Sequence, residues 1–326
     1  MHRLKESLVG AVLALVLAAA MPLAFAQDAS RGSGKIIVGN APGGGTDVVA
    51  RIVASYLSSL LGINYVVENR PGASGNIAAE AVAKAAPDGN TLLAVFNSHS
   101  TIGPLFPNLP FDPVRDLASV GQISDTPYLL VARNNIGADN LRELVEQAKR
   151  SKRPVTAGTA GRGTPQHLLF EILGKTSGIT VSAIHYKGTA PAQNDLLGGH
   201  LDVSLMTPSL GAQMVKAGKS KLLAVTSEAR LADFPNVPTV REQGFDSLAG
   251  SGVWIALLVP GKTPRPTVMR LNKALNDALK FPETIDKLKV VGMTPTGGPP
   301  EYLDKIIQTE QAAWTALIRE LSITVE

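Results

Sequence analysis

A glycine-rich turn at the head of a predicted helix is the first feature of this sequence with chemical meaning. The turn follows an apolar strand and comprises Pro42, Gly43, Gly44, Gly45, Thr46 and Asp47. Successive glycines allow a sharp turn and a close approach of a ligand to the backbone. A helix N-terminus adds free N–H groups and about half a positive charge. The turn therefore predicts a site for a small anion, such as a carboxylate.

A second turn of the same kind lies much further along the chain. There an apolar strand breaks at Gly158, Gly161 and Gly163 before Thr164, Pro165, Gln166 and His167 open a helix. Two such turns facing each other across a cleft would suit a solute receptor that closes on its ligand. The alternative is that both turns are only tight strand-to-helix connections, and their spacing does not decide between the two.

Motifs for enzyme chemistry were sought and are missing from the sequence. The Gly-Gly-Gly-Thr stretch lacks the lysine of a phosphate-binding loop, and neither a dinucleotide fingerprint nor a Gly-x-Ser-x-Gly elbow occurs. The chain has no cysteine, and its histidines form no metal-binding motif. We therefore expect no cofactor and no metal. A hydrolase using Ser98 or Ser100 with His99 is the enzyme alternative, but neighbouring residues on an extended chain point to opposite sides.

Short apolar strands that alternate with helical segments must position these turns. The predicted strands are Ile36–Val38, Tyr65–Val67, Thr91–Val95, Tyr128–Val131, Val155–Ala157, Val203–Met206, Leu222–Thr226 and Trp254–Val259. The predicted helices are Val48–Leu60, Ala78–Ala86, Leu141–Arg150, Pro165–Lys175, Ala190–Leu197, Pro264–Lys280 and Pro299–Leu321. This alternation predicts an α/β fold built around largely parallel sheets. The segments Gly103–Pro113 and Gly292–Pro300 are predicted surface connections.

The N-terminal segment has the pattern of a secretory signal peptide. Basic residues precede an apolar run, and Ala24-Phe25-Ala26 is typical of a cleavage site. An uncleaved anchor helix is the alternative, although Pro22 disfavours it. We expect cleavage after Ala26, a location in the periplasm, and no disulfide or lipid anchor, since both require cysteine. The length that remains after residues 1–26 suits two domains.

The charge and the aromatic content of the chain indicate what kind of ligand it can bind. The formal net charge is +4, and aromatic residues make up only 5% of the chain. A charge excess this dilute does not build a nucleic-acid-binding face, and few aromatic side chains are present to stack on bases or sugars. We expect a small, polar and acidic ligand.

Several long stretches resemble the extracytoplasmic solute receptors of tripartite tricarboxylate transporters, known as Bug or TctC-type receptors. They are PGGGTDVVARIVASYL, VVENRPGASGNIAAEAVAKAAPDGNTLLA, FPNLPFDPVRDLASVG, GRGTPQHLLFEILG, IHYKGTAPAQNDLLGGHLDV and LLAVTSEARLADFPNVPTVREQGF. The resemblance implies a two-lobed periplasmic binding protein, a type II-like Venus flytrap whose chain crosses between the lobes twice. Lobe one would combine residues 27–126 with 249–326, and lobe two would be 127–248.

The resemblance also implies which residues bind the ligand. In lobe one it points to Gly43, Gly44, Gly45, Thr46 and Asp47, and to Asn97, Ser98, Ser100 and Thr101 after a strand. In lobe two it points to Thr159, Arg162, Gly163, Thr164, Gln166 and His167. Members of the family bind carboxylates, carry no cofactor and deliver the solute to a membrane permease.

Some of these residues have competing roles. Asp47 would repel an anion directly, so capping its helix and pairing with Arg51 at i+4 is an equal alternative. Arg162 would either fork onto a second carboxylate or remain in solvent, and His167 would either pack or bind. Met206 stands where the family commonly has an acidic residue, which argues against amino-acid ligands and for a less polar ligand body.

The sequence thus predicts a monomeric periplasmic receptor that captures a small organic acid, a di- or tricarboxylate or an aromatic acid, and presents it to a tripartite permease. It would be neither an enzyme nor a nucleic-acid-binding protein. A periplasmic sensor that uses the same clamp to dock on a signalling protein is the second alternative.

Overall fold

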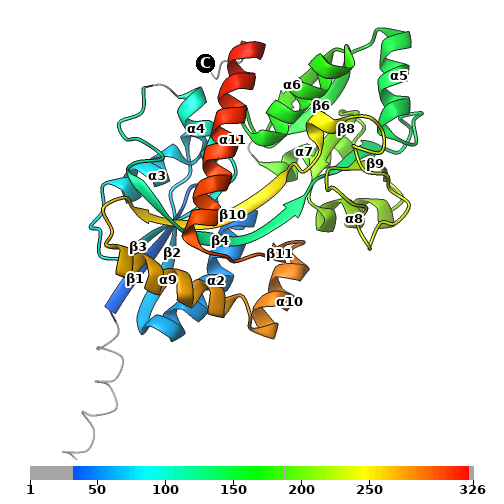
Figure 1. Ribbon diagram of the computed structural model, residues 1–326. Helices are drawn as coiled ribbons and strands as arrows, with labels where there is room; N and C mark the ends of the chain where they lie inside the picture. Colours follow the sequence, from blue (N-terminus) through cyan, green and yellow to red (C-terminus); the bar gives the residue numbers. More distant parts are fainter. Residues whose placement is uncertain (1–31, 107, 187, 323–326) are drawn as a thin grey trace, which may run out of the picture.

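The computed structural model describes residues 32–106, 108–186 and 188–322 (Figure 1). The predicted signal peptide, residues 1–26, lies outside the described residues. Two mixed β-sheets, each flanked by helices, form two layered bodies placed side by side (Figure 1). The α/β prediction is confirmed.

The first sheet has six strands in the order β11-β4-β10-β3-β1-β2. These are β1 (Gly32–Val38), β2 (Ile63–Asn69), β3 (Thr91–Phe96), β4 (Leu117–Pro127), β10 (Gly252–Pro260) and β11 (Thr294–Pro295). Strand β1 runs parallel to β2 and β3, whereas β10 is antiparallel to β3 and β4. The helical segments of this body are α2 (Gly45–Leu61), η1 (Ala73–Gly75), α3 (Asn76–Ala83), α4 (His99–Leu105), α9 (Arg265–Ala278), α10 (Pro282–Val290) and α11 (Pro300–Leu321).

The second sheet has five strands in the order β7-β6-β8-β5-β9. These are β5 (Leu129–Arg133), β6 (Val155–Thr159), β7 (Val181–His185), β8 (Val203–Met206) and β9 (Ser220–Val225). Strand β6 is parallel to β7 and β8, and β5 is antiparallel to β8 and β9. Its helical segments are α5 (Leu141–Ser151), α6 (Pro165–Ser177), α7 (Thr189–Leu197), α8 (Pro208–Lys216) and η2 (Asp246–Leu248).

Each sheet has a hydrophobic core on both of its faces. In β1, Ile36 and Val38 pack in the cluster that includes α2 and α9, while Ile37 packs in the cluster that includes α3. In β5, Leu130 and Leu129 likewise belong to two different clusters. Strands that are buried on both faces consist of continuous apolar residues, which is why most of these strands could be predicted from the sequence.

Two features of the sheets differ from the prediction. Each sheet is mixed, because β4, β5, β9 and β10 run antiparallel to their neighbours. Strand β4 was not predicted, since buried polar residues such as Gln122 and Ser124 interrupt its apolar pattern. Elements β7, α4, α8 and α10 were also not predicted, and α4 occupies the first part of the expected connection Gly103–Pro113.

The chain passes from the first sheet to the second between β4 and β5, and returns between β9 and β10. At this place the Thr226 hydroxyl accepts a hydrogen bond from Tyr128 N (2.8 Å). Strands β4 and β10 pair along their whole lengths, so the outgoing and returning chains lie next to each other. The two passages therefore form one narrow connection (Figure 1).

Candidate functional site

The loops that follow β1, β2 and β3 lie together. Arg70 N donates to the carbonyl of Val38 (2.8 Å), and the Asn69 amide donates to the carbonyl of Asn40 (3.0 Å). The Ser98 hydroxyl lies 3.5 Å from the carbonyl of Ser74. Parallel strands place their carboxyl ends at one edge of a sheet, which is where ligands bind in open α/β sheets. These loops therefore form one wall of a candidate site.

Asp47 holds the glycine-rich turn in shape. Its carboxylate accepts hydrogen bonds from Gly43 N (2.9 Å), from Arg51 Nε (3.1 Å) and from the Asn69 amide (2.9 Å). Burial alone would raise the pKa of Asp47, but the hydrogen bonds from Arg51, Gly43 and Asn69 outweigh burial and hold the pKa below its usual value. The carboxylate is thus ionised and fully engaged by the protein, in agreement with the predicted pair with Arg51.

The start of α2 leaves backbone donors at the surface of this turn. Gly44 occupies the cap position and makes no side-chain cap, so the capping role given above as one alternative for Asp47 is not seen. The first N–H groups of a helix have no acceptor within the helix. A Cβ atom added to Gly45 would meet nothing within 4 Å, so space is open beside these donors. At Gly44, by contrast, an added Cβ would lie 3.2 Å from the carbonyl of Ala41.

The polar residues after β3 point to two sides, because they form α4 instead of an extended chain. The Thr101 hydroxyl donates to the carbonyls of Ser98 (2.8 Å) and Gly163 (3.2 Å), so Thr101 and Ser98 lie on the side of the loops. The Asn97 amide donates to the carbonyl of Gly252 (2.6 Å), and Ser100 is completely buried. Asn97 therefore contacts the start of β10 and Ser100 lies beside Glu310 of α11, so both side chains are engaged away from the loops, contrary to the prediction.

The loops after β6 and β7 form the opposite wall. Tyr186 N donates to the carbonyl of Thr159 (3.1 Å), and Gly188 N donates to that of Ala160 (3.0 Å). Gln166 fixes the turn from within, since its oxygen accepts from Ala160 N (3.2 Å) and its nitrogen donates to the carbonyl of Leu205 (3.0 Å).

The remaining hydrogen bonds of this turn are local. The Thr164 hydroxyl donates to the carbonyl of Gly161 (2.7 Å), and Gly163 N donates to His167 Nδ1 (3.0 Å). Gly161 and Gly163 both have positive φ, at 150° and 76°, which favours glycine at these positions. The turn is therefore built largely by its own polar groups.

Two histidines lie against each other beside this turn. The rings of His167 and His185 meet edge to face, with centroids 4.5 Å apart. Because His167 Nδ1 accepts from Gly163 N, a neutral His167 carries its proton on Nε2, which lies 3.5 Å from Glu171. Burial, with smaller contributions from His185 and Arg162, lowers the pKa of His167 to about 4. Burial and Arg162 also lower the pKa of His185, so both rings are neutral near pH 7.

Arg162 is exposed, and its positive charge lies close enough to both histidines to lower their pKa values.

Met206, in contrast, does not lie at the loops. It is completely buried in an apolar cluster with Leu129, Leu196 and Met214, so its side chain faces the core of the second sheet. A role for Met206 in contacting a ligand is therefore not supported, because strand β8 turns it away from the loops.

Hydrogen bonds join the two bodies on two sides. Thr101, at the start of α4, donates to Gly163 in the turn before α6 (3.2 Å). On another side, the Ser209 hydroxyl donates to the carbonyl of Val291 (3.3 Å), and an added Cβ at Gly292 would lie 2.6 Å from Ser209 Oγ. The start of α4 thus lies against the turn before α6, and the two bodies are in direct contact there.

Several residues of these walls were not predicted from the sequence. Asn40, Ser74 and Gly75 line a small hollow with Ser98 at the end of the first sheet. His185 and Gly188 belong to the second wall, as described above. The signal for both was present in the sequence, because GASGN and KGTAP are also glycine-containing helix starts.

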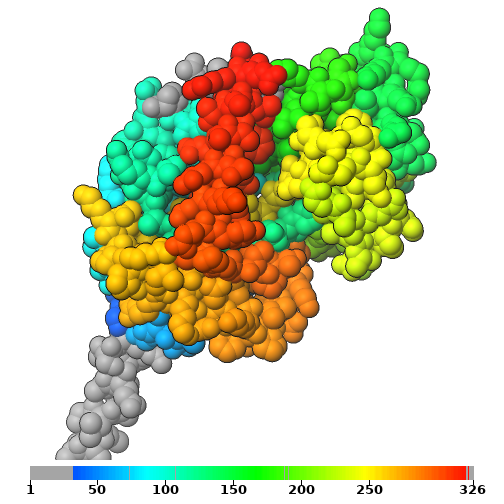
Figure 2. Space-filling view, in the orientation of Figure 1, coloured from blue at the N-terminus to red at the C-terminus, as the bar shows by residue number. Residues whose placement is uncertain are grey.

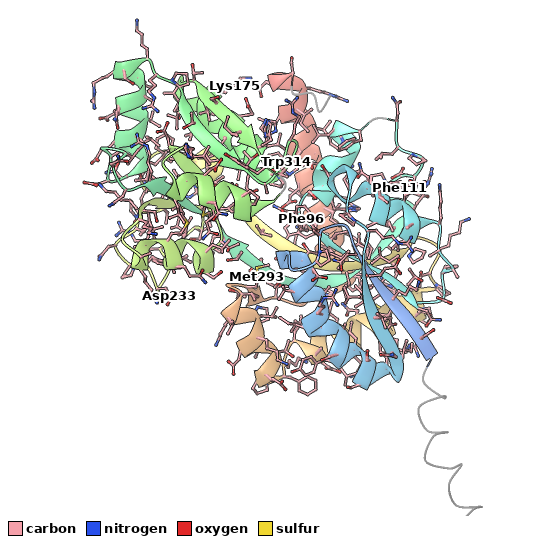
Figure 3. The ribbon with its side chains drawn as sticks, turned by 180° about the vertical axis from the view of Figure 1, so that it is seen from behind. Phe96, Phe111, Lys175, Asp233, Met293 and Trp314 are labelled. Atoms are coloured by element: carbon pink, nitrogen blue, oxygen red, sulfur yellow. The ribbon has the colours of Figure 1, made fainter. Side chains whose placement is uncertain are left out.

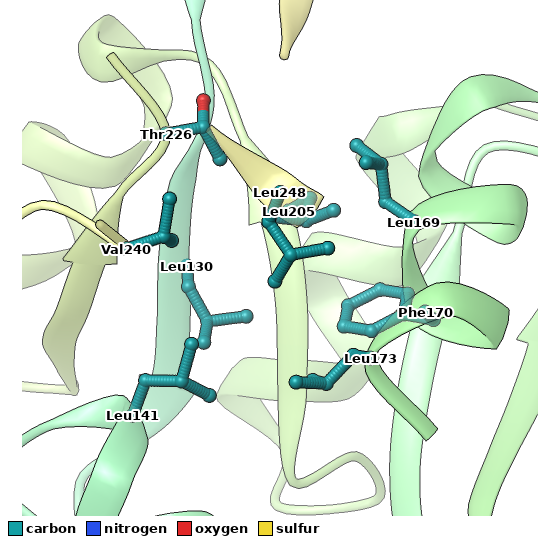
Figure 4. A pocket seen from close by; sticks show the side chains of 9 residues that line it. All are labelled: Leu130, Leu141, Leu169, Phe170, Leu173, Leu205, Thr226, Val240 and Leu248. Atoms are coloured by element: carbon teal, nitrogen blue, oxygen red, sulfur yellow. The ribbon is translucent and has the colours of Figure 1, made fainter. Parts of the chain in front are cut away.

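A small cavity in the core of the second body is not the candidate ligand site. It is lined by Leu130, Leu141, Leu169, Phe170, Leu173, Leu205, Thr226, Val240 and Leu248 (Figure 4). Its volume is about 10 Å³, hardly the size of one water molecule.

Across the described residues, no group of three or more His, Cys, Asp or Glu side chains is placed to hold a metal ion. No helix in the same residues has the length and apolar character needed to cross a membrane.

Two mixed α/β bodies with a narrow double connection, and loops that face each other, are the architecture of periplasmic binding proteins. The chain belongs to the tripartite tricarboxylate transporter receptor family (TctC), whose family model matches residues 49–323. Family members are periplasmic solute-binding proteins, and the resemblance read from the sequence is confirmed.

Named relatives and solved structures agree with this assignment. The chain is 36% identical to the "UPF0065 protein in the TAR-I ttuE-ttuC' intergenic region" of Agrobacterium vitis, covering 95% of this chain and 90% of that protein. It is 34% identical to BugT of Bordetella pertussis, covering 88% of each.

Two solved structures are from Rhodopseudomonas palustris. Rpa4515 with adipate has a TM-score of 0.81 and 29% identity, covering 90% of this chain and 98% of that one. MatC with bound malate has a TM-score of 0.78 and 29% identity, covering 89% and 99%.

Proposed function

We propose that this protein captures a small dicarboxylate between its two walls of loops and delivers it to the permease of a tripartite tricarboxylate transporter. The observation that carries the proposal is the contact between Thr101 and Gly163, which joins the start of α4, in the loops of the first wall, to the glycine-rich start of α6 in the second wall. Two similar receptors were solved with the dicarboxylates adipate and malate, which supports this ligand class.

One carboxylate would bind at the start of α2, where the N–H groups of Gly45 and Thr46 adjoin open space. Ser98 and Thr101 would contact the body of the acid from the same wall. The far carboxylate would lie toward the second wall, near Arg162, whose charge also acts on His185. Asp47 would shape the turn and would not touch the ligand directly.

The domains follow from the two sheets. We propose that lobe one comprises residues 27–126 and 249–326, and lobe two residues 127–248, with the connection between β4 and β5 and that between β9 and β10 as the hinge. We further propose cleavage of the signal peptide after Ala26 and a monomeric state. Closing of the lobes would exclude water and select the ligand by its polar groups.

No catalytic role is proposed. His99, the histidine nearest in sequence to Ser98 and Ser100, has its Nε2 atom 3.1 Å from the carbonyl of Pro113. Burial lowers the pKa of His99 to about 4, and its ring is 3% exposed. A general base must reach the hydroxyl that it activates, and this ring is turned into lobe one.

The test is a thermal-shift screen of the purified protein against mono-, di- and tricarboxylates, aromatic acids, amino acids and sugars. A ligand at 100 times its dissociation constant adds about 2.7 kcal/mol of stability, a readily measured rise in midpoint. We expect the largest rise with a dicarboxylate. A protein that responds to sugars and to none of the acids contradicts the proposal.

A further inference from the structure

One face of helix α11 packs first against lobe one and then, toward the C-terminal end of the helix, against lobe two. Leu303 and Ile307 are buried in a cluster of lobe one. One turn further, the carboxylate of Glu310 accepts a hydrogen bond from the indole of Trp254 in β10 (2.9 Å), on a strand of the proposed hinge. Trp314, one more turn along, packs against the core of lobe two. Residues at this spacing share one face of a helix.

The last turns of α11 form an apolar contact between the lobes, which we call the seam. The seam consists of Leu105, Leu168 and Ile318, with Phe106, Trp314 and Leu317 packed against them. Leu168 is 0% exposed, and Leu105 and Ile318 are each 7% exposed, so the centre of the contact is buried. At its edge, Lys175 of α6 and Glu320 of α11 form an ion pair of 2.7 Å.

The pictures show the same contact from two sides. In the space-filling view, the upper end of α11, in red, touches the green surface of lobe two (Figure 2). From behind, Trp314 lies in the middle of the molecule, where α11 passes between lobe two and the helices of lobe one (Figure 3). The helix therefore forms a third connection between the lobes, in addition to the two chain passages.

The seam joins the two helices that begin at the candidate site. Leu105 lies one turn beyond Thr101 in α4, and Leu168 lies one turn beyond Thr164 at the start of α6. Thr101 and Gly163 are themselves hydrogen-bonded across the lobes. Because a helix is rigid over one turn, the side chain of Ile318 fixes where the first turns of α4 and α6 lie relative to each other.

We propose that Ile318 and Trp314 are positioning residues: through the seam, α11 holds α4 and α6 in register and sets the fraction of molecules whose lobes are closed. Because the seam buries apolar side chains of both lobes, moving the lobes apart on this side would expose them to water, so the seam favours the closed arrangement. When only a fraction of the receptor molecules is in the conformation that can bind ligand, the apparent affinity is reduced by that fraction. The inference rests on the proposed function for its affinity measurement.

The decisive comparison is between Ile318→Ala and Ile307→Ala. Both residues are isoleucines of α11 with similar exposure, 7% and 6%, but Ile307 packs inside lobe one alone. Each substitution removes the same apolar atoms, and we expect similar falls in the thermal midpoint. Only Ile318→Ala should weaken binding of the best dicarboxylate from the screen, by about tenfold if the closed fraction falls to about a tenth. Ile318→Val should restore most of that affinity.

A second measurement needs no ligand. The chain has no cysteine, so spin labels can be attached at cysteines introduced at two exposed positions, Lys84 of lobe one and Arg150 of lobe two. Pulsed electron resonance then gives the distance between the lobes. We expect a longer or broader distance distribution in Ile318→Ala and an unchanged one in Ile307→Ala.

The inference is overturned if the two variants show the same label distances and the same affinity. Should the unmodified protein bind none of the acids, the proposed function fails, and the label distances still decide whether the seam controls the approach of the lobes.

Discussion

Both carboxylate oxygens of Asp47 accept hydrogen bonds from the protein itself. The pair with Arg51 was predictable, because residues four apart are neighbours on a helix. The bond from Asn69 was not predictable, since it depends on β2 lying beside β1. At the scale of single residues, the sequence thus predicted the turn and the pair of Asp47 with Arg51, but the three-dimensional structure decides which groups of the turn remain available to a ligand.

Gly45 gives the sharpest test at this scale. A side chain at Gly45 meets no protein atom, so Gly45→Val should leave the thermal midpoint unchanged or slightly raised. The same side chain would occupy the space beside the free amides, and we expect dicarboxylate affinity to fall by at least about tenfold, or about 1.4 kcal/mol. Titration calorimetry measures the change. Gly32→Val, at the opposite end of β1, is the control, and equal affinity in both variants would remove the turn from the site.

Helix α4 shows what the sequence could not give at the scale of elements. It is seven residues long and contains Pro104, so neither its length nor its composition indicates a helix. An extended chain would have placed Asn97, Ser98, Ser100 and Thr101 on alternating sides. The helix instead separates them into Ser98 and Thr101, which face the loops, and Asn97 and Ser100, which contact β10 and α11.

The two faces of α4 should respond differently to mutation. Thr101→Val removes the hydroxyl that reaches Gly163, and we expect dicarboxylate affinity to fall about fivefold, the value of one net hydrogen bond. Ser100→Ala removes a buried hydroxyl beside Glu310, so its effect should be on the unfolding midpoint, with affinity changed less than about twofold. The reverse pattern in calorimetry and thermal unfolding would show that the assignment of the two faces is wrong.

At the scale of the whole molecule, apolar periodicity predicted most helices and most strands but not their partners. The stripe along α11 was visible in the sequence as an apolar face, yet only the structure shows that it passes from lobe one to lobe two. The mixed sheets were missed for a similar reason, since strand direction depends on how distant segments meet. The order of the family's stretches did predict the two-body architecture.

Buried histidines predict how stability responds to acid. His99 has a pKa of about 4 when folded, against about 6.5 when unfolded. Between these values the unfolded chain binds more protons, so this residue makes the free energy of unfolding fall as pH drops from 6.5 toward 4. Burial raises the pKa values of Glu310 and Glu171, and these residues act in the opposite direction. The pH dependence of the free energy of unfolding of the whole protein is therefore the sum of both kinds of contribution.

The contribution of His99 is isolated by His99→Gln, which keeps a side-chain nitrogen for the carbonyl of Pro113. We expect its midpoint to fall less than that of the unmodified protein between pH 6.5 and 4.5. His200→Gln, at an exposed position, is the control. Thermal unfolding across this range gives the comparison, and parallel curves for all three proteins would rule out a neutral, buried His99 as a source of the acid sensitivity.

The most direct test of the central claim is a crystal structure with the dicarboxylate that gives the largest thermal shift. We expect one carboxylate within hydrogen-bonding distance of the backbone nitrogens of Gly45 and Thr46, directly or through one water, with the other end toward the loop before α6. An acid bound elsewhere, for example in the hollow of about 270 Å³ lined by Arg142 and Lys149, with the two walls of loops empty, would contradict it.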